Sequence, residues 1–376
     1  MNLRTEILGG LDAALRSVDG RRVTAGFLRA RDIRRTSVAA VGKAAAAMLQ
    51  GAIDALGPSM RAALLVTKHA HTPDELRVDP RCQCLEAAHP LPDEASLVAG
   101  GALLEFIGRV PPGDDLLLLV SGGASSLVEV LREGVTLDQM IALTRDGLSS
   151  ARDIAALNAE RGRLSRLKAG GLTAAINRAA LALFLSDVPG DDPAVIGSGL
   201  LAPRRGDEIE RHVVARIDDA LAAAALALQA EPSEIHIAPR ALDHDTETAA
   251  NGLMQALQRH RICIFGGESL VRLPPTPGRG GRNQHLGLIL AGRIAGRNDV
   301  AILACGTDGT DGPTSDAGAL VDGGTWSRIE DAGIDPLQSL ALADSGTALA
   351  AAGDLVHTGP TGTNVGDLLI AMRRLM

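Results

Sequence analysis

Residues 114–128, DDLLLLVSGGASSLV, decide the fold predicted for the rest of the chain. The run LLLLV is short, wholly apolar and β-branched at its end, as expected of a strand buried on both faces. The SGG that follows predicts a sharp turn, and ASSL predicts the start of a helix. Two glycines let a ligand approach the backbone closely, and the first amides of a helix attract anions. The stretch therefore predicts either a phosphate- or carboxylate-binding turn or a plain strand–helix connection.

The composition limits the classes of protein to which the chain can belong. A length of 376 residues predicts about two domains, and a hydrophobic content of 46% is ample for large cores. Aromatic residues make up 1% and the net charge is −8, which argues against binding to nucleic acid. The four cysteines form no CxxC pair, which fits a reduced, cytoplasmic setting. The N-terminus lacks the apolar region of a signal peptide, and no apolar run approaches the roughly 18 residues of a membrane span.

Strand-like and helix-like segments alternate along the chain, and this alternation predicts a parallel sheet covered on both faces by helices. An Ala-rich helix is expected over residues 209–229. The domain boundary is expected soon after it, which gives an N-terminal α/β domain, residues 1–240, and a C-terminal α/β domain, residues 241–376. In the second domain the sequence predicts strands over 262–265, 270–273 and 300–305 and a helix over 283–295.

Polar or glycine-rich turns follow most of the strand-like runs. Ligands of open α/β sheets bind beyond the carboxyl ends of the strands. The turns supply two cations, Lys43 and Arg282, and several carboxylates, among them Asp187, Glu268 and Asp308. Cations neutralise a transferring phosphoryl group, and carboxylates hold Mg²⁺, so the inventory suits phosphoryl transfer.

Each of these residues also has a simpler interpretation. Lys43 opens an Ala-rich helix, where a cation is disfavoured unless it faces an anion, but it could also be solvated. Arg282 could be a surface arginine, Glu268 a capping residue and Asp308 a turn residue. The histidines near prolines and loops lack metal-ligand spacing and are interpreted as loop residues or substrate contacts: His69, His71 and His89.

Nine short motifs, in order along residues 41–368, resemble the glycerate 2-kinase family with a C-terminal MOFRL domain. They read VGKAAAAM, HPLPDEAS, SGGASSL, LNAERGRLSRLKAGGL, SDVPGDDP, GGE, GRGGRNQHL, GTDGTDGP and TGPTGTNVGDL. The resemblance implies an enzyme that uses ATP and a divalent metal, taken as Mg²⁺, to phosphorylate D-glycerate to 2-phosphoglycerate. It also implies a larger Rossmann-like N-terminal domain, a smaller C-terminal domain and an active site in the cleft between them. A homodimer is possible, and the sequence leaves the oligomeric state open.

The resemblance assigns site residues by motif. Lys43 and Arg282 would be catalytic, and Asp187, Glu268 and Asp308 are the candidates for metal ligand or base. Contacts to substrate or phosphate are expected from five further residues: Ser121, Gly122, Gly123, Ser125 and Asn283. The chain departs from the family pattern at Ala124, which replaces a glycine, at Gly366, which replaces an asparagine, and at Asp316, where an acid is shifted.

Two other functions stay open at this point. One is an NAD(P)H-dependent hydroxypyruvate reductase, against which the lack of a well-placed GxGxxG argues. The other is a non-catalytic protein that binds a nucleotide or a sugar acid.

Overall fold

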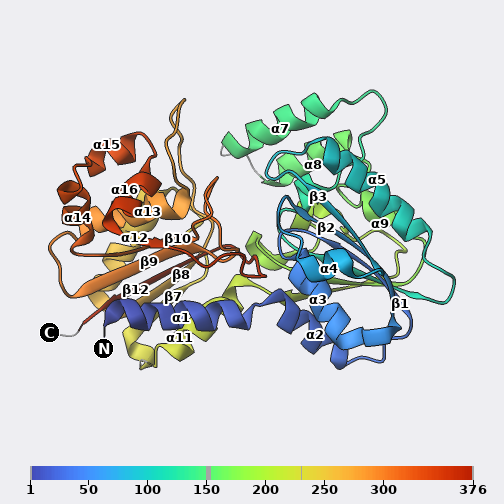
Figure 1. Cartoon of the computed structure of the whole chain (residues 1–376), viewed down its shortest axis with the longest axis horizontal. Helices are drawn as coiled ribbons and strands as arrows, with labels where there is room; N and C mark the ends of the chain where they lie inside the picture. The colour runs from blue at the N-terminus through green and yellow to red at the C-terminus, as the bar shows by residue number, and fades with distance from the viewer. Residues whose placement is uncertain (1, 150–153, 230, 375–376) are drawn as a thin grey trace. The chain divides into compact units, whose positions relative to one another are not determined.

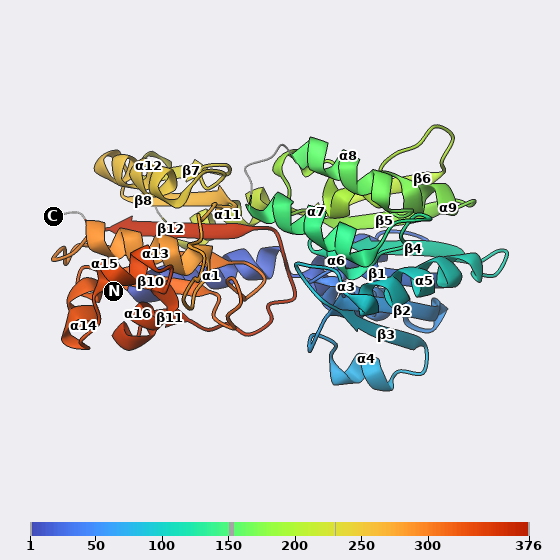
Figure 2. The same ribbon diagram turned by 90° about the horizontal axis from the view of Figure 1, so that it is seen from above.

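The chain divides into two compact units, drawn as ribbons in Figures 1 and 2. The computed structural model describes residues 2–149, 154–229 and 231–374. The N-terminal unit comprises Asp19–Arg216 and Gly362–Val365, and the C-terminal unit comprises Met1–Val18, Ile217–Thr361 and Gly366–Met376. This division differs from the expected boundary near residue 240, because the first helix and residues 217–240 group with the C-terminal unit.

The N-terminal unit has a six-stranded sheet in the order β3-β2-β1-β4-β5-β6. All its strand pairs are parallel, so the prediction of a parallel sheet is confirmed for this unit. The order is that of the Rossmann fold. The strands are β1 (Thr36–Val41), β2 (Met60–Lys68), β3 (Cys82–Ala87), β4 (Asp115–Val120), β5 (Ala180–Leu185) and β6 (Ile209–Ala215).

Strand β6 contradicts the helix predicted over residues 209–229, which begins only at α11 (Ile217–Ala227). The segment IERHVVA lies along β5, from Ala180 paired with Ile209 to Leu185 paired with Ala215. Two adjacent valines fit a strand better than a helix, and pairing with β5 decides the outcome. Helices α7 (Leu137–Ser149) and α8 (Ile154–Leu164) lie between β4 and β5 in the sequence, and residues 150–153 are outside the described part.

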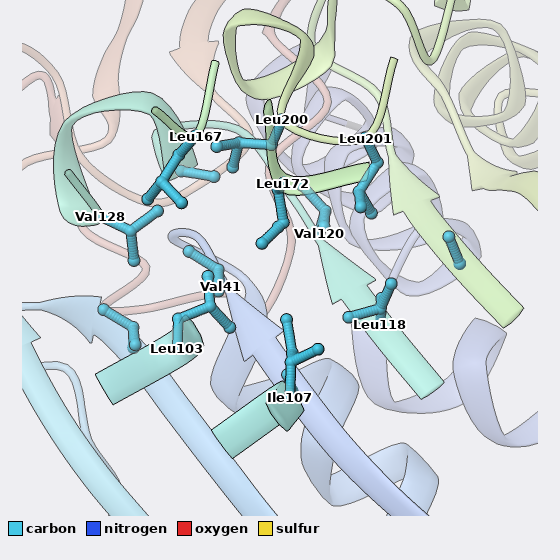
Figure 3. Packing of buried hydrophobic residues seen from close by; sticks show 14 of the residues in the cluster. Val41, Leu103, Ile107, Leu118, Val120, Val128, Leu167, Leu172, Leu200 and Leu201 are labelled. Atoms are coloured by element: carbon cyan, nitrogen blue, oxygen red, sulfur yellow. The ribbon is translucent and has the colours of Figure 1, made fainter. Parts of the chain in front are cut away.

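Helices pack on both faces of this sheet. Helix α3 (Ala45–Leu56) contacts β1, β2 and β4, and α5 (Glu94–Gly108) contacts β1, β2 and β3 from the other side (Figure 1). Alternate residues of the strands, such as Val41 and Val120, join Leu103 and Ile107 of α5 in one apolar core (Figure 3). The remaining helices of this unit are α2 (Gly20–Arg29), α4 (Asp74–Val78), α6 (Ala124–Leu127), α9 (Gly171–Ala175) and α10 (Ile196–Gly199).

The C-terminal unit has a mixed sheet in the order β11-β10-β9-β12-β8-β7. Its last strand, β12 (Asp367–Arg373), runs antiparallel between β8 (Ile262–Gly267) and β9 (Val300–Gly306). The expectation of parallel sheets throughout is therefore wrong for this unit. The other strands are β7 (Ile235–Ala238), β10 (Gly318–Asp322) and β11 (Leu355–Val356).

The strand expected over residues 270–273 is also wrong, since Leu270 forms only an isolated bridge with Asp245. Two prolines follow this run, and proline cannot donate to a strand ladder. The helices of this unit, besides α11, are α1 (Leu3–Ser17), α12 (Thr246–Arg259), α13 (Arg282–Arg293), α14 (Thr325–Asp331), α15 (Pro336–Ala341) and α16 (Ser345–Ala352). Across the described residues, every helix is too short or too polar to cross a membrane.

Candidate active site

Three of the predicted site segments meet at one edge of the N-terminal sheet. Lys43 follows β1, the SGG turn follows β4 and Asp187 follows β5. These strands are neighbours and run in the same direction, and the last residue of β4, Val120, pairs with Val41 at the end of β1 and with Phe184, one residue before the end of β5. Because parallel strands end at the same edge, segments far apart in sequence come together here.

The turns after β1 and β4 are hydrogen-bonded to each other. The Lys43 amide donates to the Gly122 carbonyl at 2.9 Å, and the Ala44 amide donates to the Ser121 hydroxyl at 3.0 Å. Gly42 has a φ of 136°, and a Cβ there would lie 2.6 Å from the Ser121 carbonyl oxygen. Only glycine allows this approach. Ser121 is fully buried, so its hydroxyl holds the start of α3, and the ligand contact assigned to it stays a prediction.

Gly122 lies against a pair of polar side chains. The Asn364 side-chain amide donates to Asp187 Oδ2 at 2.9 Å. A Cβ on Gly122 would lie 1.7 Å from that oxygen and 2.0 Å from Asn364 Nδ2. The glycine is therefore required for these groups to sit where they do. Asn364 was not among the predicted site residues, although it lies in the quoted motif TGPTGTNVGDL.

Gly123 is flanked by the side chains of Lys43 and His89. Its φ is 82°, and a Cβ there would lie 3.0 Å from Lys43 Cγ and 3.1 Å from His89 Cδ2. Lys43 and His89 therefore both border the SGG turn. His89 follows β3, so it reaches the same edge of the sheet as the other turns.

The helix after the SGG turn is confirmed but short. Helix α6 spans four residues, so its dipole contributes little to anion binding, contrary to the expectation from sequence. Ser125 in this helix hydrogen-bonds through Oγ to Ser198 Oγ at 2.6 Å, and Ser198 Oγ accepts from Arg161 Nη1 at 3.2 Å. Arg161 and Ser198 were missed by the sequence analysis, although Arg161 lies in one of the quoted motifs.

In the C-terminal unit, Arg282 forms ion pairs with two carboxylates, those of Glu268 and Asp367. Arg282 Nη2 lies 2.8 Å from Glu268 Oε1, and Arg282 Nε lies 2.5 Å from Asp367 Oδ2. Burial opposes the charge on Arg282, but Asp367 and Glu268 together raise its pKa well above the usual value. Burial raises the pKa of Asp367 to about 7, although Arg282 acts in the opposite direction.

The antiparallel course of β12 explains why Asp367 reaches this position. Asp367 is the first residue of β12 and pairs with Gly267 at the end of β8 and with Gly306 at the end of β9. The start of one strand thus lies beside the ends of two others. A prediction of parallel strands could not bring these residues together.

Asp311 anchors the start of α13. Its carboxylate accepts from the amides of Asn283 at 3.1 Å and Gln284 at 2.8 Å, and from Asn283 Nδ2 at 3.2 Å. This fixes the helix turn that begins with Arg282. The buried Asn283 side chain is thus used within the protein, so its role toward a substrate stays a prediction. Asp308 accepts from the amide and the hydroxyl of Thr310, at 2.9 and 3.0 Å, as a turn residue does.

The carboxylates do not form a closed metal site. No group of three or more His, Cys, Asp or Glu residues that could hold a metal occurs among the described residues. Asp187 belongs to one unit, whereas Glu268 and Asp308 belong to the other. Mg²⁺ commonly needs only one or two carboxylates besides phosphates and water, so carboxylates from a single unit suffice for a Mg²⁺ ion bound to a nucleotide.

Comparisons with known proteins identify relatives of the chain over most of its length. A family model described as "Domain of unknown function (DUF4147)" matches residues 7–227, and the "MOFRL family" model matches residues 261–367. A D-glycerate 2-kinase of Thermotoga maritima is 33% identical over 91% of each chain. A protein of Agrobacterium vitis, 34% identical over 95% of this chain and 91% of its own, carries the provisional name hydroxypyruvate reductase.

The fold comparison gives the same relationship. The crystal structure of a glycerate kinase from Thermotoga maritima matches with a TM-score of 0.85 at 31% identity, covering 99% of both chains. The first family model alone spans more than half of this chain. The matched models, the similar kinases and the shared fold together show that the chain belongs to the glycerate 2-kinase family with a C-terminal MOFRL domain.

Proposed function

We propose that this protein transfers the γ-phosphoryl group of ATP to the 2-hydroxyl of D-glycerate, giving 2-phosphoglycerate and ADP. The observation that carries the proposal is the edge of the N-terminal sheet, where Lys43, a turn of small residues and Asp187 converge. Such a site can bring a cation, close backbone and a carboxylate to one phosphoryl group. Phosphoryl transfer depends mainly on this kind of positioning and charge neutralisation.

Within this edge each residue has a distinct role. Lys43, whose stem lies beside Gly123, neutralises charge on the transferring phosphoryl group. The backbone amides of Gly122 and Gly123 bind the anionic substrate, and the absence of a side chain at Gly122 leaves room for Asp187 and Asn364. Asp187, held by Asn364, orients the hydroxyl and accepts its proton as the oxygen–phosphorus bond forms.

Arg282 supplies the second cation of the reaction. Glu268 and Asp367 fix its guanidinium in one orientation and keep it charged at every physiological pH. A fixed, always charged fork suits a group that stabilises developing charge without rearranging.

Mg²⁺ would be held by phosphate oxygens and by one or two of the carboxylates Asp187, Glu268 and Asp308. When bound, the ion neutralises charge on the phosphates of ATP. The protein's own contribution is to hold the acceptor hydroxyl and the two cations in place.

A hydroxypyruvate reductase is the second candidate, because the similar Agrobacterium vitis protein carries that name. In a dinucleotide-binding Rossmann fold, the turn after the first strand reads GxGxxG. Here the turn after β1 reads VGKAAAAM, with one glycine followed by a lysine. This turn favours the kinase.

Steady-state kinetics with matched variants tests the proposal. ADP release is measured with ATP, Mg²⁺ and D-glycerate for Lys43→Met and Arg282→Met. The controls are Arg61→Met and Arg259→Met, which remove exposed arginines from the amino end of β2 and the end of α12. Each site variant should lose at least about 100-fold in kcat/KM and each control should stay near wild type.

Three outcomes would count against the proposal. A loss below about tenfold in the site variants, which is about 1.4 kcal/mol of barrier, would remove their assigned roles. NADH oxidation with hydroxypyruvate, without ADP release from glycerate, would favour the reductase. Calorimetric binding of ATP or glycerate without turnover would indicate a non-catalytic binding protein.

A further inference from the structure

A buried cluster of charged residues lies behind the SGG turn. Glu129 is fully buried, Lys168 is 3% exposed, and the Lys168 ammonium is bonded to Glu129. The second Glu129 oxygen accepts from the hydroxyl of the buried Ser165. Lys168 and Ser165 therefore satisfy both oxygens of Glu129, and the charges of Lys168 and Glu129 cancel.

Residues of the apolar core lie next to this buried cluster in the sequence. Val128, Leu167 and Leu200, which directly precede or lie near the polar residues in sequence, pack in one core (Figure 3). Surroundings of this kind screen charge poorly, so a charge left without a partner here is costly.

Arg161 adds a second cation that this cluster does not neutralise. In the described part of the chain Arg161 forms no direct ion pair, and its Nε atom is buried without a hydrogen-bond partner. Burial lowers the pKa of Arg161, and the more distant Glu129 offsets this in part. Burial also lowers the pKa of Lys168, Glu129 opposes this, and Arg161 lowers it further, so the two cations repel. Arg161 and Lys168 thus carry two positive charges, and Glu129 carries the one negative charge that faces them.

The loop around Ser198, which accepts a hydrogen bond from Arg161, has an unusual backbone conformation. Ser198 has a φ of 57° between Gly197 and Gly199, which also have positive φ. A non-glycine residue in this region is uncommon, because its Cβ crowds the backbone. The strained turn directs the Ser198 hydroxyl to both Arg161, at 3.2 Å, and Ser125, at 2.6 Å. The excess positive charge is thereby linked to the SGG turn.

We propose that Arg161 binds an anionic oxygen group of a substrate at the SGG turn, either the carboxylate of the hydroxy acid or a phosphate of the nucleotide. A bound oxyanion would offset the unneutralised charge and could use the planar fork of the guanidinium. The identity of the two substrates rests on the proposed function, but the need for an anion does not. The protein without ligand thus keeps a charge that ligand binding neutralises.

The first test needs no enzymatic activity. Urea unfolding is measured for wild type, Arg161→Gln and Arg163→Gln, the last removing an exposed arginine two residues along α8. Without added anion, R161Q should be at least as stable as wild type, because it removes a half-buried charge that has no ion-pair partner among the described residues and that repels Lys168. Added inorganic phosphate should stabilise wild type and R163Q but not R161Q. Equal stabilisation of all three proteins would overturn the proposal.

The second test identifies the source of the anion. In kinase assays R161Q should raise the KM of one substrate at least about tenfold, with a smaller change in kcat and none in R163Q. A raised KM for D-glycerate indicates the carboxylate, and a raised KM for ATP indicates a phosphate. Unchanged KM values for both substrates in a folded R161Q would refute the role.

If R161Q does not fold, Arg161→Lys replaces it in the kinase assay. This variant keeps the positive charge but loses the planar guanidinium, and unchanged KM values for both substrates would again refute the role. A wild-type protein without kinase activity that still shows the phosphate effect would refute the proposed function alone.

Discussion

A single methyl group on Gly122 should damage the site more than the fold. The added Cβ would lie 1.7 Å from Asp187 Oδ2, whereas ordinary contacts begin near 3.4 Å. The oxygen must therefore move by the difference, about 1.7 Å. Such a shift breaks the 2.9 Å hydrogen bond between Asn364 and Asp187. A hydrogen bond to a charged group contributes about 1.5–3 kcal/mol, so Gly122→Ala should destabilise the fold by about that amount.

The effect on catalysis should be larger, because a misplacement of about 1 Å can cost about 100-fold in rate. We expect G122A to lose at least that factor in kcat/KM while it remains folded. Gly101→Ala is the matched control: Gly101 lies exposed in α5, and a Cβ there meets nothing within 4 Å. G101A should keep full activity and gain up to about 1 kcal/mol of stability. Urea unfolding and coupled assays on both variants measure these effects. If G122A were as active as G101A, the Asp187–Asn364 pair would have no part in the reaction.

Three further predictions concern stability. Gly42→Ala should cost about 3 kcal/mol or more in urea unfolding, because its Cβ would lie 2.6 Å from the Ser121 carbonyl at a φ of 136°; a loss below about 1 kcal/mol would contradict this. Although burial acts against ionisation, hydrogen bonds and Arg77 lower the pKa of Glu86 from 4.5 to about 2, so its stabilisation is present above pH 4.5 and lost as the pH falls through 2. Glu86→Gln should therefore cost about 3 kcal/mol at pH 7 and almost nothing near pH 2, and a cost that does not change with pH would refute the assignment. Asp311→Ala should lower stability by about 2–3 kcal/mol and reduce kcat, since the carboxylate accepts from two amides of α13; an unchanged thermal midpoint would contradict its anchoring role.

The parts of the structure that depend on local pattern were predictable. The apolar run before SGG predicted β4, and the position of Lys43 and Asp187 after parallel strands predicted that both would lie at the carboxyl edge of the sheet, as they do. The roles of individual side chains were less accessible. Ser121 was expected to contact a ligand; its buried hydroxyl accepts from the Ala44 amide at the start of α3, and the ligand contact stays a prediction. A serine after a strand suits both ligand binding and accepting a hydrogen bond from the amide at a helix start, so sequence alone cannot separate these roles.

The parts that depend on pairing between distant segments were missed. The acid Asp367 stands at the start of an apolar run, and only the antiparallel placement of β12 brings it to Arg282. Asn364 reaches Asp187 because residues 362–365 group with the N-terminal unit, whereas the residues on either side of them group with the C-terminal unit. Arg161 appeared as one charge in a charged helix, and its significance depends on the burial of Glu129 and Lys168.

The most direct test of the account is a phosphorus NMR spectrum of wild-type protein incubated with ATP, Mg²⁺ and D-glycerate. The account predicts loss of the γ-phosphate resonance, appearance of ADP, and a new phosphomonoester signal split into a doublet by the single proton on carbon 2. A triplet would show transfer to the 3-hydroxyl and contradict the assigned position. Inorganic phosphate alone, or unchanged ATP, would contradict the assignment as a glycerate kinase.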